Sequence, residues 1–479
     1  MKHLVLIILV LTSSLASAYV PRAFVNLFEW KWADIGKECR QVLAPLGYTA
    51  VQVSPPNEHL VAQGFPWYQR YQPVSYKLQS RSGTEEEFVR MVKDCRSAGV
   101  EVYVDAVINH MTAVFVDVPQ FRGSAGSSFG HYTYPGIYSY DDFHHCQMND
   151  GDEIRNYGNR FEVQSCELGN LADLKTESPL VRRTLVEYLR KLVSIGVTGF
   201  RIDAAKHIPA SDLEAILGPF NRFYVYQEVI GSDAEPIQPR EYLGTGAVTE
   251  FKFTGHVSSF FQTGKLSWFN NNKPLGEAWG YLPSNRSVVF VDNHDTQRMP
   301  GLLSHKQKEK YKLASVFMLA WPYGYPQVMS SFAFDDPRSG PPADERGQTK
   351  QVTCLPEGQR LGPSSGWVCE HRWRAIAAMV EFRRITAEEP RITDWWSNDH
   401  SQIAFGRGNK GFVVINNEAT RLERMLKTSL PPGRYCNVLK ASLRENGCAG
   451  NLVTVGPLGE VTVSLNSFDA LALHLGSRL

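Results

Sequence analysis

The stretch "GFRIDAAKH", residues 199–207, places two charged side chains inside an otherwise apolar run. Its glycine, phenylalanine and isoleucine are typical of a buried strand. Because side chains two positions apart on a strand point the same way, Arg201 and Asp203 are expected to share one face. A buried charge lowers stability by several kcal/mol unless a partner compensates it. We therefore expect this pair to serve a chemical purpose.

Short runs rich in Val, Ile, Phe and Tyr recur along the chain and alternate with helical patterns. One of the helical patterns, residues 84–99, opens with a capping box made by Thr84 and Glu87. Strands that alternate with helices predict a parallel sheet, and about eight such units favour a closed (β/α)8 barrel. The expected strands are 23–30, 48–56, 100–110, 198–205, 223–230, 246–251, 287–295 and 325–331.

Two parts of the chain depart from the alternation. Residues 111–173 are rich in Gly, Tyr, Asp and Asn and are too long for an ordinary loop, so we interpret them as an inserted subdomain. Residues 386–479 contain short runs typical of strands with turns between them, which predict a small antiparallel β-sandwich. The barrel itself is then expected to occupy residues 19–110 and 174–385. The runs in the last part are 402–408, 411–417, 434–440, 452–457 and 460–465.

The first 18 residues, "MKHLVLIILVLTSSLASA", have a basic start, an apolar middle and a small-residue end. This order is typical of a secretory signal peptide, with cleavage expected after Ala18. Its apolar run, residues 4–11, is too short to cross a bilayer. We therefore expect a secreted, extracellular protein, acting as a monomer. The net charge of +1 gives no sign of a nucleic-acid or anionic-membrane partner.

The chain has eight cysteines, an even number that favours disulfides in an oxidising compartment. Sequence alone allows many pairings, and the absence of Cys-x-x-Cys spacing argues against a metal site. The sequon at Asn285 is a low-specificity glycosylation motif. Local spacing favours Cys146–Cys166, Cys354–Cys369 and Cys436–Cys448, which leaves Cys39 for Cys95.

Three carboxylates lie at or beyond the ends of different predicted strands: Asp203, Glu228 and Asp295. In a (β/α)8 barrel these ends carry the active residues. A retaining glycosidase needs one carboxylate as nucleophile and one protonated carboxyl as acid. Arg201 should keep Asp203 ionised as the nucleophile, and Glu228, after an apolar run, suits the acid/base role. Taken singly, each carboxylate is more often a cap or a surface group; their conjunction favours catalysis.

Seven stretches resemble the alpha-amylase family, glycoside hydrolase family thirteen. Four of them are similar to its signature motifs and occur in the family's order. Three more are similar to the animal-type secreted members, and the resemblance covers nearly the whole mature chain. The first four are "DAVINH" (105–110), "GFRIDAAKH" (199–207), "QEVI" (227–230) and "FVDNHD" (290–295); the others are "PWYQRYQPVSYKL" (66–78), "VMSSFAF" (328–334) and "GWVCEHRW" (366–373).

The resemblance implies a barrel with a lid after its third strand, and hydrolysis of internal α-1,4 bonds in starch and glycogen with retention. It makes Asp203 the nucleophile, Glu228 the acid/base and Asp295 the third carboxylate, which stabilises the transition state. Aromatic rings of the 66–78 stretch would stack on glucose; as isolated aromatics they would be ordinary core residues. The implied substrate-binding residues are Trp67, Tyr68, Tyr71, Gln72, His110, Arg201, Lys206, His207 and His294.

The resemblance also implies a structural calcium between barrel and lid. Calcium prefers several hard oxygen ligands, including backbone carbonyls. The matching positions are Asn109, Asp173 and the carbonyls of Gln164 and His207. Gln164 stands where the animal enzymes usually have an arginine, and a carbonyl is indifferent to that change. The plainer alternative is that Asn109 shapes a turn and Asp173 caps a helix.

Animal members hold a chloride ion with two arginines and an asparagine. Arg201 and Asn293 match that set, but Gln327 stands in place of the second arginine. The missing positive charge weakens the attraction for an anion, so we expect chloride to bind weakly or not at all. The glycine-rich mobile loop of vertebrate members is also missing, because "MPGLLSHKQKEK" leads quickly into a helix.

Two other functions compete with an endo-acting amylase. A non-catalytic relative would keep the barrel as a binding module, and its mark would be a lost carboxylate. An exo-acting α-glucosidase, such as a maltase, is the second alternative. The "AKH" that follows Asp203 and the "QPVSYKL" stretch favour the endo-acting branch.

Overall fold

The computed structural model describes residues 22–113, 122–149, 151–357, 359, 366–441, 448 and 450–479. The predicted signal peptide, residues 1–18, lies outside these ranges. Across the described ranges, no helix is both long enough and apolar enough to pass through a membrane.

Eight parallel strands close into a barrel, as the sequence predicts. Closure is achieved because the first strand pairs with both the second and the last. Their side chains are almost all buried, which is why the strand sequences are mostly apolar rather than alternating, with a few buried polar and charged exceptions such as Asp105 and Arg201. The barrel strands are β1 (Phe24–Leu27), β2 (Ala50–Val53), β3 (Glu101–Ala106), β6 (Gly199–Ile202), β7 (Tyr224–Gln227), β8 (Ala247–Thr249), β11 (Ser287–Val289) and β12 (Tyr325–Ser330).

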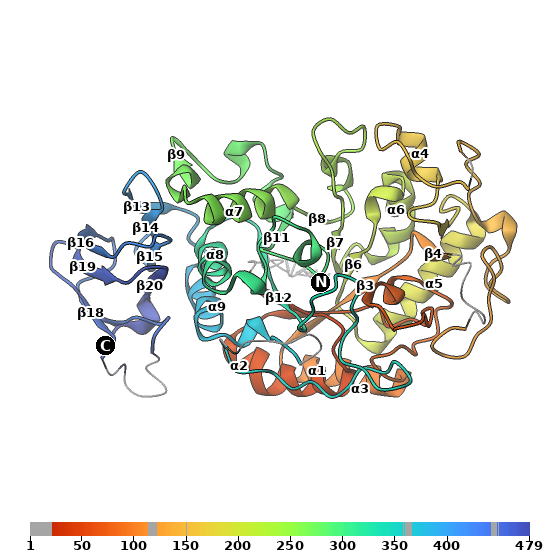
Figure 1. The fold of residues 1–479 in the computed structure, drawn as a ribbon, viewed down its shortest axis with the longest axis horizontal. Helices are drawn as coiled ribbons and strands as arrows, with labels where there is room; N and C mark the ends of the chain where they lie inside the picture. The colour runs from red at the N-terminus through yellow and green to blue at the C-terminus, as the bar shows by residue number, and fades with distance from the viewer. Residues whose placement is uncertain are drawn as a thin grey trace, which may run out of the picture.

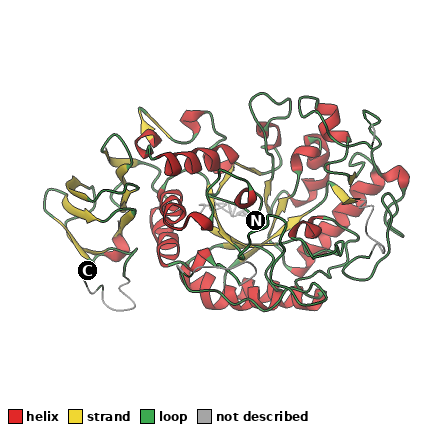
Figure 2. Ribbon diagram, viewed as in Figure 1, coloured by secondary structure: helices red, strands yellow, loops and turns green. Residues whose placement is uncertain are grey.

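Helices surround the barrel strands (Figure 2). The predicted capping box is present: Thr84 Oγ1 accepts from the Glu87 amide at 3.3 Å, and Glu87 accepts from the Thr84 amide at 2.9 Å. The helix of residues 179–195 ends at Gly196, which takes the left-handed conformation at φ +114°. The helices are α1 (Trp32–Glu38), α2 (Ala44–Leu46), α3 (Glu85–Ser97), α5 (Pro179–Ile195), α6 (Ala210–Leu217), α7 (Phe251–Thr263), α8 (Lys308–Ala320) and α9 (Arg374–Thr386).

The segment between β3 and β6 forms structure of its own. β4 (His110–Ala113) pairs antiparallel with β5 (Leu171–Asp173), and α4 (Arg160–Ser165) lies between them in the chain. Buried aromatic side chains, including Tyr134 and Phe143, fill its interior. The predicted subdomain limits at 111 and 173 stay a prediction, since β4 begins one residue before the first of them.

The C-terminal part consists of two four-stranded antiparallel sheets. They share one apolar core, to which Phe412 and Val414 contribute from one sheet and Leu426 and Val463 from the other. In Figure 1 these sheets and the inserted segment lie on opposite sides of the barrel. One sheet contains β13 (Ile392–Ser397), β14 (Gln402–Arg407), β15 (Gly411–Asn416) and β20 (Asp469–His474); the other contains β16 (Leu422–Lys427), β17 (Gly433–Cys436), β18 (Leu452–Val455) and β19 (Glu460–Leu465).

All eight cysteines form disulfides, in the four pairs that local spacing favoured. Cys39 follows α1 and Cys95 lies in α3, so this bond joins two neighbouring helices outside the barrel. The other three bonds each close a loop of 12 to 20 residues. Covalent closure of this kind stabilises the fold mainly by restricting the unfolded chain.

Candidate active site

Two of the predicted carboxylates follow adjacent strands of the barrel. Asp203 comes directly after β6 and Glu228 directly after β7. The strand register pairs Ile202 with Gln227, so the residues that follow them, Asp203 and Glu228, lie at the same height at the carboxyl end of the barrel. Both residues are buried, with 7% and 8% of their surface exposed. The carboxyl ends of the strands therefore bring these groups together, as the barrel prediction required.

The guanidinium of Arg201 joins the carboxylates. Its Nη1 lies 2.6 Å from Asp105 Oδ1 and 2.7 Å from Asp203 Oδ1, and its Nη2 lies 2.6 Å from Glu228 Oε1. The first two contacts are hydrogen bonds, whereas no N–H of Nη2 points at the oxygen of Glu228. One buried cation thus serves three buried carboxyls, which explains why the strand carries charged residues.

Asp105, the first residue of the "DAVINH" stretch, is a further member of this cluster, and no role was assigned to it from the sequence. It lies in β3, in register with Arg201 on β6, and its carboxylate also accepts hydrogen bonds from Tyr71 Oη at 2.9 Å and Gln52 Nε2 at 3.2 Å. A signal was available in the sequence, because Asp105 interrupts the apolar strand run "VEVYVDAVINH". The rule that exposed Arg201, a charge inside a buried strand, applies to Asp105 as well.

Asp295, the third carboxylate, lies six residues beyond the end of β11 and is more exposed, at 24% of its side chain. His294 Nε2 lies 3.3 Å from its Oδ2, and its backbone amide donates to Asn293 Oδ1 at 3.0 Å. Burial and the nearby charge of Glu228 raise the pKa of Asp295 to about 7, while Arg201 and Arg298 lower it. This mutual influence places Asp295 in the same cluster as the other two.

Arg201 does not by itself determine the ionisation of Asp203. Burial raises the pKa of Asp203 well above its usual value; Arg201 lowers it, and the carboxyls of Glu228 and Asp105 raise it further. The expectation that the arginine dominates is therefore corrected. One cation is thus shared by three carboxyls, and these carboxyls influence one another's ionisation.

A stack of rings lies beside the carboxylates. His294 packs between Phe28 and Tyr71, with ring centroids 4.8 Å and 5.1 Å away and planes nearly parallel. Burial lowers the pKa of His294 well below its usual value, and Arg201 and Arg298 lower it further, so this ring is neutral. Trp67 meets the stack edge-on at 5.7 Å from His294. Trp67 and Tyr68 are half-buried, whereas Tyr71 is buried against His294.

Two other predicted substrate-binding residues are buried and bonded within the protein. His110 Nε2 donates to the Tyr71 carbonyl at 3.0 Å, and burial lowers the pKa of His110 to about 4. Gln72 is 4% exposed, and its side chain accepts from the Ala113 amide at 3.1 Å. Both residues hold the walls of the site in place, and contact with substrate stays a prediction for each.

Lys206 and His207 lie on the short 3-10 turn that follows β6. The ammonium of Lys206 is paired with Glu235 and lies 4.9 Å from the centre of the Tyr157 ring. His207 Nδ1 donates to the Val163 carbonyl at 3.0 Å, and burial lowers the pKa of His207 to about 4. Glu235, the partner of Lys206, was not identified from the sequence, because no motif or pattern in its loop distinguishes it from other carboxylates.

Of the predicted calcium ligands, Asn109 and Asp173 are in contact, one directly before β4 and the other at the end of β5. Asn109 Nδ2 donates to Asp173 Oδ1 at 3.2 Å, and both residues are almost fully buried. The His207 ring donates to the Val163 carbonyl, and the Gln164 side chain donates to the Lys206 carbonyl at 3.4 Å, so the segments that carry the other two predicted ligands are in contact. Burial raises the pKa of Asp173 to about 7. Asp173 Oδ2 lies 2.7 Å from His144 Nδ1, so both oxygens of this carboxylate have partners within the protein. Calcium takes carboxylate and amide oxygens as ligands, and its binding here stays a prediction.

The predicted chloride residues do not fit an anion. Both terminal nitrogens of Arg201 already face carboxylate oxygens. Asn293 Oδ1 accepts from the Asp295 and Thr296 amides, at 3.0 Å and 2.8 Å. Gln327 Nε2 donates to Gln52 Oε1 at 2.5 Å and to Tyr226 Oη at 3.1 Å. The surroundings of Arg201 are thus anionic and Gln327 adds no charge; weak or absent chloride binding stays a prediction.

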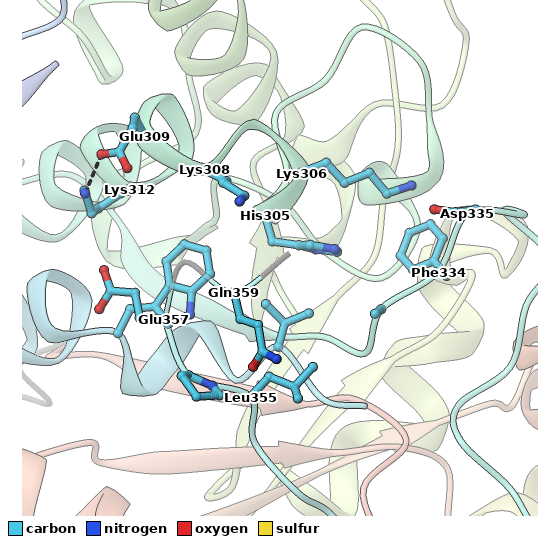
Figure 3. A pocket seen from close by; sticks show the side chains of 14 residues that line it. His305, Lys306, Lys308, Glu309, Lys312, Phe334, Asp335, Leu355, Glu357 and Gln359 are labelled. Atoms are coloured by element: carbon cyan, nitrogen blue, oxygen red, sulfur yellow. Dashed lines mark ion pairs between the residues drawn. The ribbon is translucent and has the colours of Figure 1, made fainter. Parts of the chain in front are cut away.

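A cavity of about 580 Å³ lies elsewhere, between α8 and the segment before Cys369 (Figure 3). Its charged side chains balance, and Lys312 is paired with Glu309. Phe334 lines the cavity on one side, and the ammonium of Lys306 lies over its ring, 3.9 Å from the ring centre. None of the three predicted catalytic carboxylates lines this cavity.

Comparisons with known proteins agree with this geometry. The family described as "Alpha amylase, catalytic domain" matches residues 41–220, and the one described as "Alpha amylase, C-terminal all-beta domain" matches residues 395–476. The alpha-amylase-related proteins of Drosophila kikkawai and Drosophila ercepeae are each 43% identical to this chain. The alignments cover 95% and 99% of this chain and 93% and 99% of those proteins.

Solved structures are similar as well. Wild-type alpha-amylase I from Eisenia fetida is 38% identical, with a TM-score of 0.88 over 95% of this chain and 97% of that chain. A glutamate-to-glutamine mutant of the same enzyme, solved as a complex with maltohexaose, gives the same values. CldA, described as a cyclomaltodextrin glucanotransferase, has a TM-score of 0.69 at 19% identity, which shows a shared fold alone.

Proposed function

The chain belongs to the alpha-amylase family, glycoside hydrolase family thirteen, and from this premise we propose that it is an active alpha-amylase. It cleaves internal α-1,4-glucosidic bonds in starch, glycogen and related glucans, with retention at the anomeric carbon. The observation that carries the proposal is the shared cation: Asp203 and Glu228, from adjacent strands, both lie within 2.7 Å of Arg201.

In the first step, an oxygen of Asp203 attacks the anomeric carbon while Glu228 gives its proton to the departing glycosidic oxygen. This forms a covalent glycosyl ester and releases the leaving chain as an alcohol. In the second step, Glu228 removes a proton from water, which attacks the same carbon and frees Asp203. The first step consumes the proton of Glu228 and the second step restores it.

The contacts of Arg201 support this division of roles. Asp203 receives a well-directed hydrogen bond from Nη1, which favours its ionised form. Glu228 lies 2.6 Å from Nη2 without accepting a hydrogen bond from it. The retaining mechanism requires Glu228 to carry the proton that it gives to the leaving oxygen. Asp295, at the more exposed edge, is placed to hold sugar hydroxyls as the anomeric carbon becomes positive.

The substrate and setting follow from the same proposal. Trp67 and Tyr68 offer partly exposed ring faces on which glucose units stack. The maltohexaose complex of the Eisenia fetida enzyme supports a glucan chain as the occupant of this cleft. A leader with the features of a signal peptide and four disulfides support secretion, with the chain acting as a monomer.

We propose that calcium binds at Asn109, Asp173 and the carbonyls of Gln164 and His207. When bound, the ion supplies positive charge and a cross-link rather than chemistry on the sugar. Asn109 follows β3, whereas Asp173 ends β5, so these residues tie the barrel to the inserted segment. His207, four residues after Asp203, extends this tie to the loop of the proposed nucleophile.

A non-catalytic barrel is the principal alternative, because the similar Drosophila proteins carry names that state relationship rather than activity. Catalysis is supported over this alternative because all three carboxylates are retained, two of them in contact with Arg201 and the third within electrostatic influence of Glu228 and Arg201. An exo-acting α-glucosidase is the second alternative. It differs in releasing sugar from chain ends, so it lowers viscosity slowly for each bond cleaved.

The test is turnover on soluble starch by the native chain, by Glu228→Gln and by Glu423→Gln. Glu423 lies on the exposed face of β16 and is the matched control. We expect Glu228→Gln to lower turnover by a factor of about 100 to 10,000, while the control keeps native activity. Viscosity should fall faster than reducing ends appear. Near-native turnover of Glu228→Gln removes that residue from its role, and an inactive native chain contradicts the proposal.

A further inference from the structure

We infer that Arg298 is a positioning residue that holds Trp67, the aromatic wall of the cleft, against the loop that carries Asp295. The inference rests on the proposed function, since it concerns how the same cleft keeps its sugar-binding face. Arg298 closes the short 3-10 turn that begins directly after Asp295.

The guanidinium of Arg298 lies within a cage of four aromatic rings. Its central carbon is 4.4 Å from the ring centre of Phe334 and 4.8 Å from that of Trp67. Phe28 and Phe332 complete the cage, each at 5.5 Å. These rings come from three separate parts of the chain, following β1, within the 66–78 stretch and following β12. A cation over several ring faces stabilises their mutual arrangement.

Two hydrogen bonds from Arg298 join the same segments. Nη1 donates to the carbonyl of His294, and Nε donates to the carbonyl of Pro337 at 3.1 Å. The Pro337 carbonyl also accepts from Trp67 Nε1 at 2.9 Å. Arg298 and the indole of Trp67 therefore donate to the same carbonyl, and the guanidinium lies over the indole ring. This shared acceptor fixes both the tilt and the depth of the Trp67 ring.

The charge of Arg298 has no carboxylate bonded to it. Within the described part of the chain, Arg298 makes no ion pair, and its buried Nη2 has no hydrogen-bond partner. An arginine that only filled space here would be replaced by an apolar residue at no loss. The planar guanidinium of Arg298 donates to two carbonyls in different directions and stacks on Trp67 at the same time. A lysine ammonium has no planar group and cannot do both.

The consequence for the reaction is separable from folding. A glucose unit binds more tightly when the Trp67 ring is already held in one orientation, because ordering that side chain during binding costs conformational entropy. Releasing Trp67 should therefore raise KM more than it lowers kcat. The positive charge of Arg298 also faces Asp295, so a lysine at this position keeps the charge while losing the fork.

The experiment is a double-mutant cycle with Arg298→Met and Trp67→Ala, measured as KM and kcat on soluble starch. We expect Arg298→Met to raise KM about tenfold in the native background and to change it less than twofold in the Trp67→Ala background. Arg298→Lys should restore folding and part of kcat, but not KM. Arg338→Ala, on the same loop with 76% of its side chain exposed, is the control and should match the native chain.

A second readout separates this inference from the proposed function. Binding of maltohexaose is measured by tryptophan fluorescence in a Glu228→Gln background, which needs no catalysis. Loss of affinity on Arg298→Met that disappears without Trp67 supports the inference, even if the chain proves to be a non-catalytic binder. Equal losses with and without Trp67, in either measurement, overturn it. Full affinity in Arg298→Lys overturns it as well, because charge alone would then suffice.

Discussion

At the scale of single residues, the site is organised by buried charges that compensate one another. Arg201 could be singled out from the sequence because a charge in an apolar strand demands an explanation. Asp105 obeys the same rule and was missed only because its partner lies 96 residues away in the chain. Glu235 and Arg298 could not be identified, since both lie in loops whose contacts depend on the closed fold.

Chloride dependence is decided by one residue, Gln327. Its amide is bonded to Gln52 and Tyr226, and the guanidinium of Arg201 already faces three carboxyls. We therefore expect starch hydrolysis to stay within about twofold after dialysis from chloride into acetate buffer, since an anion gains little attraction from an uncharged amide. The measurement is initial rate against chloride concentration. Activity that collapses in acetate and returns with added chloride contradicts this.

At the scale of helices and strands, alternation and capping predicted the barrel well. All eight barrel strands lie within the predicted runs, because each is apolar and bounded by turns. Three C-terminal strands, β13, β16 and β20, were not predicted from the sequence. β16 reads "LERMLK", whose buried residues do not alternate with exposed ones. β13 is half-buried along its length and carries a register shift, whereas β20 is buried almost throughout.

Glu38, the last residue of α1, ties that helix to the turn before α9. Its carboxylate accepts from His371 Nε2 at 2.8 Å and Arg372 Nε at 2.7 Å. Burial alone would raise the pKa of Glu38, but the hydrogen bonds from these two residues outweigh it and lower the pKa below 4.5. A folded-state pKa below the unfolded value adds stability above pH 4.5, which is lost as the pH falls through the folded pKa.

We therefore expect Glu38→Gln to lower the free energy of unfolding by about 3 kcal/mol at pH 7. The difference from the native chain should shrink steadily below pH 4.5. Urea unfolding of both proteins at several pH values provides the measurement, with Glu423→Gln as the exposed control. A difference that is constant from pH 7 to pH 3 would show that the charge of Glu38 has no part in the tie.

At the scale of the whole molecule, the barrel is joined on one side to the inserted segment and on the other to the C-terminal sheets. Buried Arg407 of β14 makes the second junction, donating to the carbonyls of Ala320, Thr386 and Glu389. Sequence could predict three regions from composition, but not these junctions, because they depend on carbonyls at helix ends. The first junction is where the proposed calcium ligands lie.

Removing calcium should loosen that first junction. Because a ligand that binds only the folded state stabilises it, chelation with EGTA should lower the Tm by about 2–5 °C. Added calcium should restore the Tm, and Asn109→Ala should abolish both effects by removing a ligand. Differential scanning calorimetry is the measurement. A Tm that is the same with EGTA and with calcium would rule out this site.

The central claim is that Asp203 and Glu228 act as nucleophile and acid/base in one retaining centre. The anomeric form of the first product tests it most directly, read by proton NMR within minutes of adding enzyme to a maltooligosaccharide. Retention predicts that the α-anomer appears first and that the β-anomer grows only later, by mutarotation. Initial release of the β-anomer would contradict the claim, because it requires direct attack by water rather than by Asp203.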